Sequence, residues 1–135
     1  MIYLLDTNTC VYAIKREPQV LSRLQQHSPD DFGISAITVA ELWFGAAKSS
    51  RPQQTFSSVN DFLKPFEILP FATEAAEKYA ETRLLLEKAG QPIGERDLLI
   101  AATAKSRRLT VVTHNVGEFS RVSGLKVEDW RPMPQ

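Results

Sequence analysis

The stretch IYLLDTN, residues 2–8, opens the chain with an apolar run that stops at an acid. Ile2–Leu5 is apolar almost throughout, which is typical of a strand buried on both faces of a parallel sheet. Asp6 is the only formally charged side chain in the first 14 residues. A carboxylate among core-forming residues must be paired, hydrogen-bonded or bound to a metal, because desolvating it alone is costly. The stretch therefore predicts a buried strand with a constrained acid at its carboxyl end.

Short apolar runs alternate with helix-length segments along the rest of the chain, which is the pattern of a parallel sheet covered by helices. The five apolar runs predict strands at Ile2–Leu5, Phe32–Ser35, Phe66–Leu69, Leu109–Thr113 and Leu125–Glu128. The longer segments predict helices at Thr7–Arg16, Pro18–His27, Ala36–Ser49, Gln53–Leu63, Thr73–Lys88 and Glu95–Arg107. The breaks between these segments are too short to be linkers, so we expect a single α/β domain over residues 1–135.

Composition narrows the class of protein. The 135 residues include 16 Lys and Arg and 16 Asp and Glu, so no overall basic field points to a polyanionic partner. The single cysteine, Cys10, excludes an intramolecular disulfide and fits a reducing compartment. No apolar stretch approaches the ~20 residues that cross a bilayer, and no signal-peptide pattern opens the chain. We therefore expect a cytoplasmic protein with no membrane partner.

Three further acids, Glu41, Asp97 and Glu118, lie at the edges of other apolar runs. The carboxyl ends of parallel strands share one edge of the sheet, and Asp6, Glu41 and Glu118 each follow a predicted strand at a short distance. Asp97 lies in the first turn of a helix that runs back to the strand at 109–113, so its helix starts at the same edge. We therefore expect all four acids on the rim where open α/β sheets bind ligands.

Each acid also has an ordinary structural interpretation. Asp6 suits the cap of the following helix, Asp97 suits the dipole of its own helix, and Glu118 could be a solvated loop residue. Glu41 is harder to explain, because its helix is apolar nearly all round and offers it little access to water. Capping alone does not require four acids on one rim.

Four carboxylates in one pocket repel one another, so without a cation at least one should keep its proton at neutral pH. Mg²⁺ or Mn²⁺ would remove this repulsion, because these hard ions prefer oxygen ligands. Such an ion can acidify a water and neutralise charge on a phosphodiester. The chain has no EF-hand spacing, and its two histidines and Cys10 form no recognisable zinc set.

Four segments together resemble a PIN domain, and more narrowly the VapC-type toxins of bacterial toxin–antitoxin pairs. These segments are LLDTN (4–8), SAITVAEL (35–42), PIGERDLLIAATA (92–104) and VVTHNVGEF (111–119). The resemblance extends over essentially the whole chain. It implies a three-layer α/β/α sandwich with a parallel five-stranded sheet, and a Mg²⁺- or Mn²⁺-dependent endoribonuclease.

The resemblance also implies roles for individual residues. Asp6, Glu41 and Asp97 match the acidic metal ligands, and Glu118 matches the fourth acid, which is more often Asp. The supporting polar positions of the family are matched by Thr7, Asn8, Thr113 and Asn115. Glu95, beside the third acid, commonly gives way to an uncharged residue in the family. The implied partners are a structured RNA, with transfer RNA favoured, a VapB-type antitoxin and a second copy of the chain in a homodimer.

Two other functions compete with this interpretation. A receiver-type phospho-switch also gathers acids on the rim of a parallel sheet, but it needs adjacent acids after the first strand and a phosphorylatable Asp after the middle one. Here only Asp6 follows the first strand, and the strand at 66–69 ends without an acid. The second competitor is a catalytically inactive PIN-like module that binds RNA or protein. An incomplete acid set would favour it, and the set here is complete.

Overall fold

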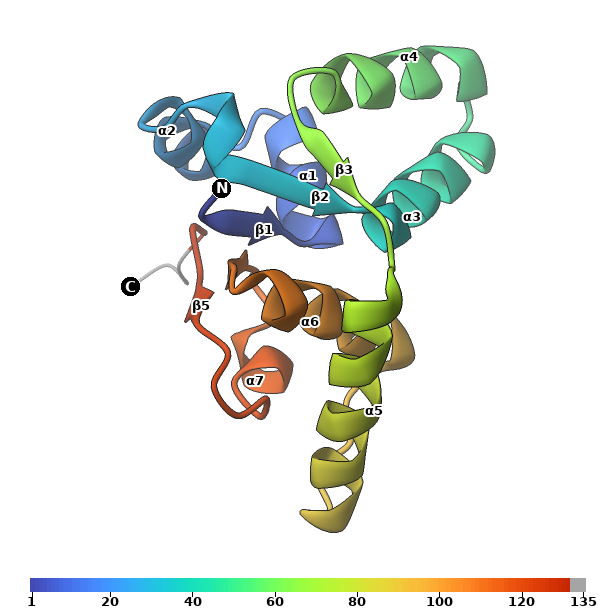
Figure 1. The fold of residues 1–135 in the computed structure, drawn as a ribbon. Coiled ribbons are helices and arrows are strands. Elements are labelled where there is room, and N and C mark those ends of the chain that lie inside the picture. The colour runs from blue at the N-terminus through green and yellow to red at the C-terminus, as the bar shows by residue number, and fades with distance from the viewer. Residues whose placement is uncertain (132–135) are drawn as a thin grey trace.

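The computed structural model describes residues 1–131 and contains one five-stranded sheet in which every pair of neighbours is parallel. The strand order is β3-β2-β1-β4-β5, so the first strand of the chain lies in the centre (Figure 1). The strands are β1 (Tyr3–Leu5), β2 (Phe32–Ser35), β3 (Glu67–Leu69), β4 (Thr110–Val112) and β5 (Val127–Glu128). All five predicted strands are confirmed, four of them one or two residues shorter than expected at one or both ends.

All six predicted helices are present. They are α1 (Thr7–Ile14), α2 (Pro18–Gln25), α3 (Ala36–Ala47), α4 (Pro52–Leu63), α5 (Thr73–Lys88) and α6 (Glu95–Arg107). The first helix ends earlier than predicted because Arg16 adopts a left-handed backbone, with φ of 62°. Two short helices, η1 (Pro29–Asp31) and α7 (Val116–Phe119), were expected as irregular segments. A single turn is too short to leave a helical period in the sequence.

The helices form two layers, one on each face of the sheet (Figure 1). Consecutive strand residues point to opposite faces: Leu5 belongs to a core cluster with α1, α2, α3 and α4, whereas Leu4 packs with α5, α6 and α7. In the same way Val112 faces the first layer and Val111 the second. This double burial explains the continuous apolar runs, and it confirms the three-layer α/β/α sandwich.

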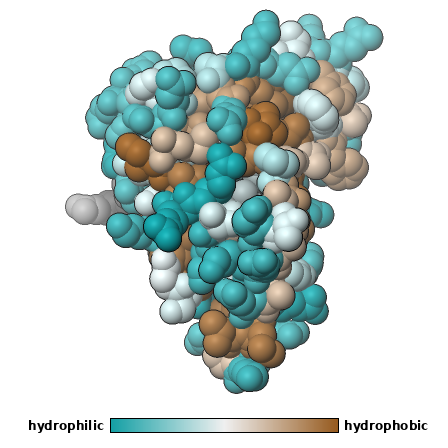
Figure 2. Space-filling view, in the orientation of Figure 1, coloured by the Kyte–Doolittle hydropathy of each residue, from teal (hydrophilic) through white to brown (hydrophobic). Residues whose placement is uncertain are grey.

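Neighbouring apolar side chains are exposed in pairs at two places on the helices. Helix α5 extends away from the sheet with α6 alongside, and its far end carries the exposed Leu84 and Leu85 (Figures 1 and 2). The other place is on the side of α3 and α4, where Trp43 and Phe44 are 47% and 64% exposed. Among the helices within residues 1–131, none combines the length and the apolar character needed to cross a membrane.

Candidate active site

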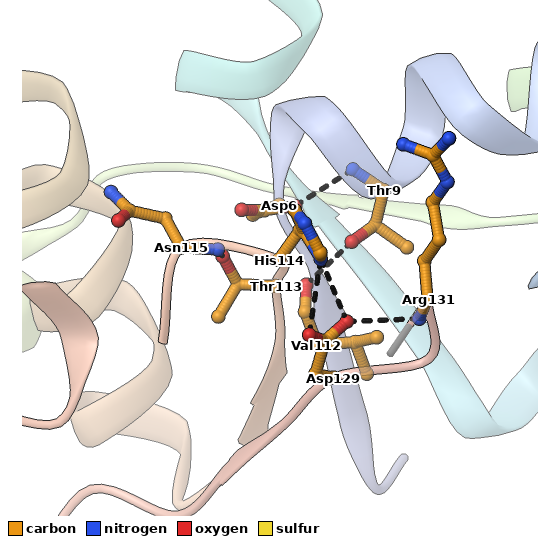
Figure 3. A network of polar contacts seen from close by, with 8 residues as sticks. All are labelled: Asp6, Thr9, Val112, Thr113, His114, Asn115, Asp129 and Arg131. Atoms are coloured by element: carbon orange, nitrogen blue, oxygen red, sulfur yellow. Dashed lines mark hydrogen bonds and ion pairs between the residues drawn. The ribbon is translucent and has the colours of Figure 1, made fainter. Parts of the chain in front are cut away.

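Asp6 is buried where β1 passes into α1, with 3% of its surface exposed. Its Oδ1 accepts a hydrogen bond of 2.8 Å from the Thr9 amide, so it caps α1 as its position predicted. Burial raises the pKa of Asp6 above its usual value, while a hydrogen bond from the Thr113 side chain and those from Thr9 lower it. Figure 3 shows this carboxylate between α1 and the end of β4. The negative charge of Glu41 also raises the pKa of Asp6.

Asp97 and Glu118 come together from the first turn of α6 and from α7. The Asn115 side chain joins them: its Nδ2 donates to Asp97 Oδ2 at 3.0 Å and to Glu118 Oε2 at 2.5 Å. The other oxygen of Glu118 accepts from the Gly94 amide at 2.9 Å, immediately before α6. The structure therefore brings the third and fourth acids of the predicted set into direct contact.

The pKa values of the two carboxyl groups shift in opposite directions. Burial, followed by the hydrogen bond and the charge of Glu118, raises the pKa of Asp97 to about 7. The same hydrogen bond and that from the Gly94 amide lower the pKa of Glu118. Without a cation, Asp97 is thus the member that holds the proton and Glu118 the member that stays ionised. The charge of Asp6 raises the pKa of Asp97 further, so the two acids lie within electrostatic range of each other.

Glu41 lies on α3, and each of its carboxylate oxygens has a donor. Thr7 Oγ1 donates to Oε1 at 2.7 Å, and Arg96 Nη1 donates to Oε2 at 3.1 Å. The side chain is 22% exposed, so the expectation that Glu41 has little access to water is wrong. The cause is that the apolar helix α3 is not buried on all sides, as the exposure of Phe44 shows.

The turn between β4 and α7 supplies the remaining polar support. Thr113 is fully buried, and its Oγ1 accepts from the Asn115 amide at 2.9 Å in addition to contacting Asp6. His114 Nδ1 lies 3.0 Å from Asp129 Oδ2, just beyond β5, which fixes the middle of the turn (Figure 3). Thr7 binds Glu41 as described, whereas Asn8 is exposed. In the part of the chain that the structure describes, the Asn8 side chain makes no hydrogen bond.

The four acids therefore gather on one rim, but they do not form a closed cage. Asp97 contacts Glu118, and Asp6 lies within electrostatic range of Asp97 and Glu41. Among residues 1–131, no three Asp, Glu, His or Cys side chains are arranged so that one metal ion could contact them all. Glu41 is held by Arg96 and Thr7, and one oxygen of Glu118 is turned toward the Gly94 amide.

The chemistry of this donor set fits a hard divalent cation. All four groups are carboxylates, which Mg²⁺ and Mn²⁺ prefer, and two of them have pKa values raised by burial and by negative neighbours. A raised carboxyl pKa shows that the site accommodates negative charge poorly by itself. A cation at the rim would reverse this, and Arg96 already supplies one positive charge to Glu41.

Three contacts at the rim were not foreseen from the sequence. The salt bridge between Arg96 and Glu41 joins α6 to α3, and no local pattern reports on such a pair. The sequence does not single out the Gly94 amide as a donor, because every residue except proline carries one. Tyr79 Oη donates to Glu95 Oε1 at 2.6 Å, which holds this carboxylate against α5.

An open groove of about 540 Å³ begins at Glu41 and runs along α3. Its polar end is lined by Thr7, Glu41 and Arg96, and its apolar end by Ile37 and Phe44. Lys48 stands above the Phe44 ring, with its Nζ 5.1 Å from the ring centroid. The groove therefore leads from a mixed apolar and cationic surface to the acids, and an extended anionic ligand could approach them along it.

The comparisons with known proteins agree with this geometry. A family model described as the PIN domain matches residues 3–125. The chain is 39% identical over 128 residues to the tRNA(fMet)-specific endonuclease VapC of Salmonella typhimurium, which covers 95% of this chain and 97% of the relative. It is 42% identical over 129 residues to ribonuclease VapC2 of Haemophilus influenzae, again covering 95% and 97%.

Solved structures show the same likeness in three dimensions. A chain of the DNA-bound VapBC from Salmonella typhimurium matches with a TM-score of 0.92 and 39% identity, over 97% of this chain and 99% of that one. A chain of VapBC2 from Rickettsia felis, bound to a promoter DNA fragment, matches with a TM-score of 0.90 and 39% identity, over 97% and 100%. The likeness therefore extends over nearly the full length of each chain.

Proposed function

This chain belongs to the VapC ribonucleases of the PIN-domain family, and from that membership we propose the site, cofactor, substrate and partners of its endoribonuclease activity. The proposed site is the rim formed by Asp6, Glu41, Asp97 and Glu118, which hold Mg²⁺ or Mn²⁺. The observation that carries this proposal is the convergence of carboxylates on one rim, where Asn115 joins Asp97 to Glu118 and Asp6 is buried. Such a cluster is stabilised when a cation binds it.

The chain's own residues hold the acids for this role. Thr9 and Thr113 fix Asp6, Thr7 fixes one oxygen of Glu41, and Asn115 holds Asp97 against Glu118. A bound divalent ion would supply a more acidic water and would neutralise charge that develops on the phosphodiester. With water as the nucleophile, rather than the ribose 2′-hydroxyl, and with the ribose 3′-oxygen as the leaving group, the products carry 5′-phosphate and 3′-hydroxyl ends.

The proposed substrate is a structured RNA, with transfer RNA favoured. Support comes from the Salmonella relative, whose name describes it as a tRNA(fMet)-specific endonuclease. A VapB-type antitoxin is the proposed protein partner, because the matching solved structures are VapBC complexes. In this proposal the protein is a growth-inhibiting toxin that acts in the cytoplasm and is neutralised by its antitoxin. It is a homodimer, and each copy consists of a single domain over residues 1–135.

An assay of RNA cleavage with defined variants tests this function. Purified protein is incubated with transfer RNA in Mn²⁺ or in chelator, and the new RNA ends are sequenced. Asp6→Asn is the decisive variant, because asparagine also caps helices well and the fold of α1 should survive. Asp61→Asn is the matched control, since Asp61 is exposed on α4, where it pairs with Lys64.

We expect cleavage by the wild type in Mn²⁺ and by Asp61→Asn, and none by Asp6→Asn or in chelator. Ends that carry 2′,3′-cyclic phosphate would refute hydrolysis by water. Expression in cells separates the enzyme from the inactive binding module. If Asp6→Asn still stops growth, binding alone accounts for the effect and the proposed catalytic function is wrong.

A further inference from the structure

Arg96 binds a carboxylate oxygen of Glu41 that a metal ion would need. Its Nη1 donates to Glu41 Oε2 at 3.1 Å, while Thr7 occupies the other oxygen of the same carboxylate. Arg96 lies one residue before Asp97 in the first turn of α6, so it reaches from the helix of one acid to the helix of another. Within residues 1–131, Glu41 is the only hydrogen-bond and ion-pair partner of the Arg96 guanidinium.

The incomplete acid cage agrees with this contact. No three acidic, histidine or cysteine side chains within the described residues are arranged around a common metal position, although four acids share the rim. Glu41 is the member whose free oxygen is taken by a cation, and that cation is Arg96. An oxygen that accepts from a guanidinium can bind a divalent ion only if two positive centres crowd together, which Coulomb repulsion opposes.

We propose that Arg96 competes with the divalent cation for Glu41, so that the chain carries its own counter-ion and sets a threshold of metal concentration for its site. The inference rests on the proposed function, because it assumes that Glu41 is a metal ligand. The Arg96 side chain is 73% exposed, so it can leave Glu41 without disturbing the core. Exchange of the guanidinium for the metal therefore requires only a side-chain rotation.

A contrary role for the same residue predicts an effect of opposite sign. If Arg96 served to hold Glu41 in the orientation that the metal needs, its removal would weaken metal binding. If it competes, its removal strengthens metal binding. The sign of the change in metal affinity therefore separates a competitor from a supporting residue, and it can be measured without any RNA substrate.

The experiment measures Mn²⁺ affinity of the full chain at pH 8 by following the free Mn²⁺ signal in electron paramagnetic resonance. Arg96→Gln removes the charge, and Arg96→Lys keeps it. The matched control is Arg121→Gln, which removes an equal charge close to Glu118 from a side chain that donates to the Pro92 carbonyl instead of an acid. Glu41→Gln and the double variant Glu41→Gln with Arg96→Gln complete a double-mutant cycle, which measures the coupling between the two side chains.

We expect Arg96→Gln to bind Mn²⁺ about two- to fivefold more tightly than the wild type, the range that an exposed ion pair permits. Arg96→Lys should lie close to the wild type, and Arg121→Gln should gain less than Arg96→Gln. Glu41→Gln should bind more weakly, and adding Arg96→Gln to it should change nothing more, because the competition acts through Glu41.

Two kinds of result would overturn the inference. An unchanged or lower affinity in Arg96→Gln refutes competition, as does an equal gain in Arg121→Gln or a full gain in the Glu41→Gln background. In these cases the proposed metal site survives as long as Glu41→Gln weakens Mn²⁺ binding. If Glu41→Gln binds Mn²⁺ as tightly as the wild type, Glu41 is not a ligand, and that part of the proposed function falls together with the inference.

Discussion

The carboxyl groups of Asp97 and Glu118 accept hydrogen bonds from the same Asn115 side-chain nitrogen, although they belong to the separate helices α6 and α7. Two carboxylates this close repel each other when both are ionised, and a cation between them or beside them relieves the repulsion. Burial, together with the hydrogen bond and the charge of Glu118, raises the pKa of Asp97 to about 7, while the hydrogen bond with Asp97 lowers the pKa of Glu118. This pair connects the pH dependence of stability to the binding of metal.

The free energy of unfolding of the metal-free protein should fall as the pH rises from about 4 to about 7. In the folded protein the pKa of Asp97 is about 7, against 3.8 for an unperturbed aspartate. The folded state therefore keeps a proton that the unfolded state releases in this window, so rising pH favours unfolding. The raised pKa of Asp6 contributes with the same sign, and the lowered pKa of Glu118 acts only below about 4.5. Urea unfolding in chelator at a series of pH values measures the effect.

Asp97→Asn is the control for this pH dependence. The amide cannot ionise, so the decline between about pH 4 and 7 should be smaller than in the wild type, and near pH 8 the variant should be the more stable protein. The difference between the two proteins reports the ionisation of Asp97 together with its coupling to Glu118. An equally steep decline in Asp97→Asn would show that another group carries the proton.

Thr113→Val should destabilise the protein by about 1–3 kcal/mol, the usual cost of leaving buried polar groups unpaired. Thr113 is fully buried, and its hydroxyl serves both the Asn115 amide and the carboxylate of Asp6. Valine has nearly the same shape as threonine, so the loss of stability reports the hydroxyl alone. Thr113→Ser keeps the hydroxyl and should be nearly as stable as the wild type. Thermal unfolding measures both. An equal loss in Thr113→Ser, which keeps the hydroxyl and lacks only the methyl group, would show that packing of the methyl group matters as much as the hydroxyl.

Much of the fold could be predicted because the apolar runs report burial directly. Ile2–Leu5 and Leu109–Thr113 predict strands covered on both faces, and Leu4 and Leu5 do enter opposite cores. The direction of parallel strands then placed the acids on a common rim without any knowledge of their contacts. The position of a residue at a strand end predicts where its backbone lies. For Asp6, burial also leaves the side chain little conformational freedom.

The contacts of the acids could not be predicted, because they depend on side chains distant in the sequence. Glu41 meets Arg96 only because α3 and α6 pack against each other, and Glu95 turns outward because Tyr79 of α5 lies beside it. An apolar pattern also fails to say whether a face is covered. Phe44 lies in a helix that is apolar nearly all round, yet 64% of its surface is exposed.

His114→Ala should slow RNA cleavage by roughly 10- to 100-fold, the range found for residues that orient the ligands of a metal. His114 lies between Thr113 and Asn115, and its bond to Asp129 fixes the turn that aims both toward the acids. The same substitution at His27 is the matched control. His27 stacks on Trp130 and pairs with Asp31, away from the acids, so His27→Ala should lower the melting temperature and leave cleavage nearly unchanged.

The positioning role of His114 has a second readout. If the ring acts by holding the turn, His114→Ala should also weaken the affinity for Mn²⁺, because Asn115 then fixes Asp97 and Glu118 less well. A slower enzyme with an unchanged Mn²⁺ affinity and an unchanged KM for RNA would contradict positioning of the acids. It would point to direct participation of the imidazole in the chemical step.

Mn²⁺ should raise the melting temperature of the wild type, and by more at pH 8 than at pH 6. Binding at a concentration of 100 times Kd stabilises a protein by about 2.7 kcal/mol, which is roughly 5–10 °C for a domain of this size. Because the pKa of Asp97 is about 7, this carboxyl group is mostly protonated at pH 6. Its proton must leave before the metal can bind, so part of the binding free energy is lost. Asp97→Asn should show a smaller shift that varies less with pH. A shift of equal size at both pH values in the wild type would mean that the metal does not displace this proton, and the ion would then have to bind elsewhere on the protein.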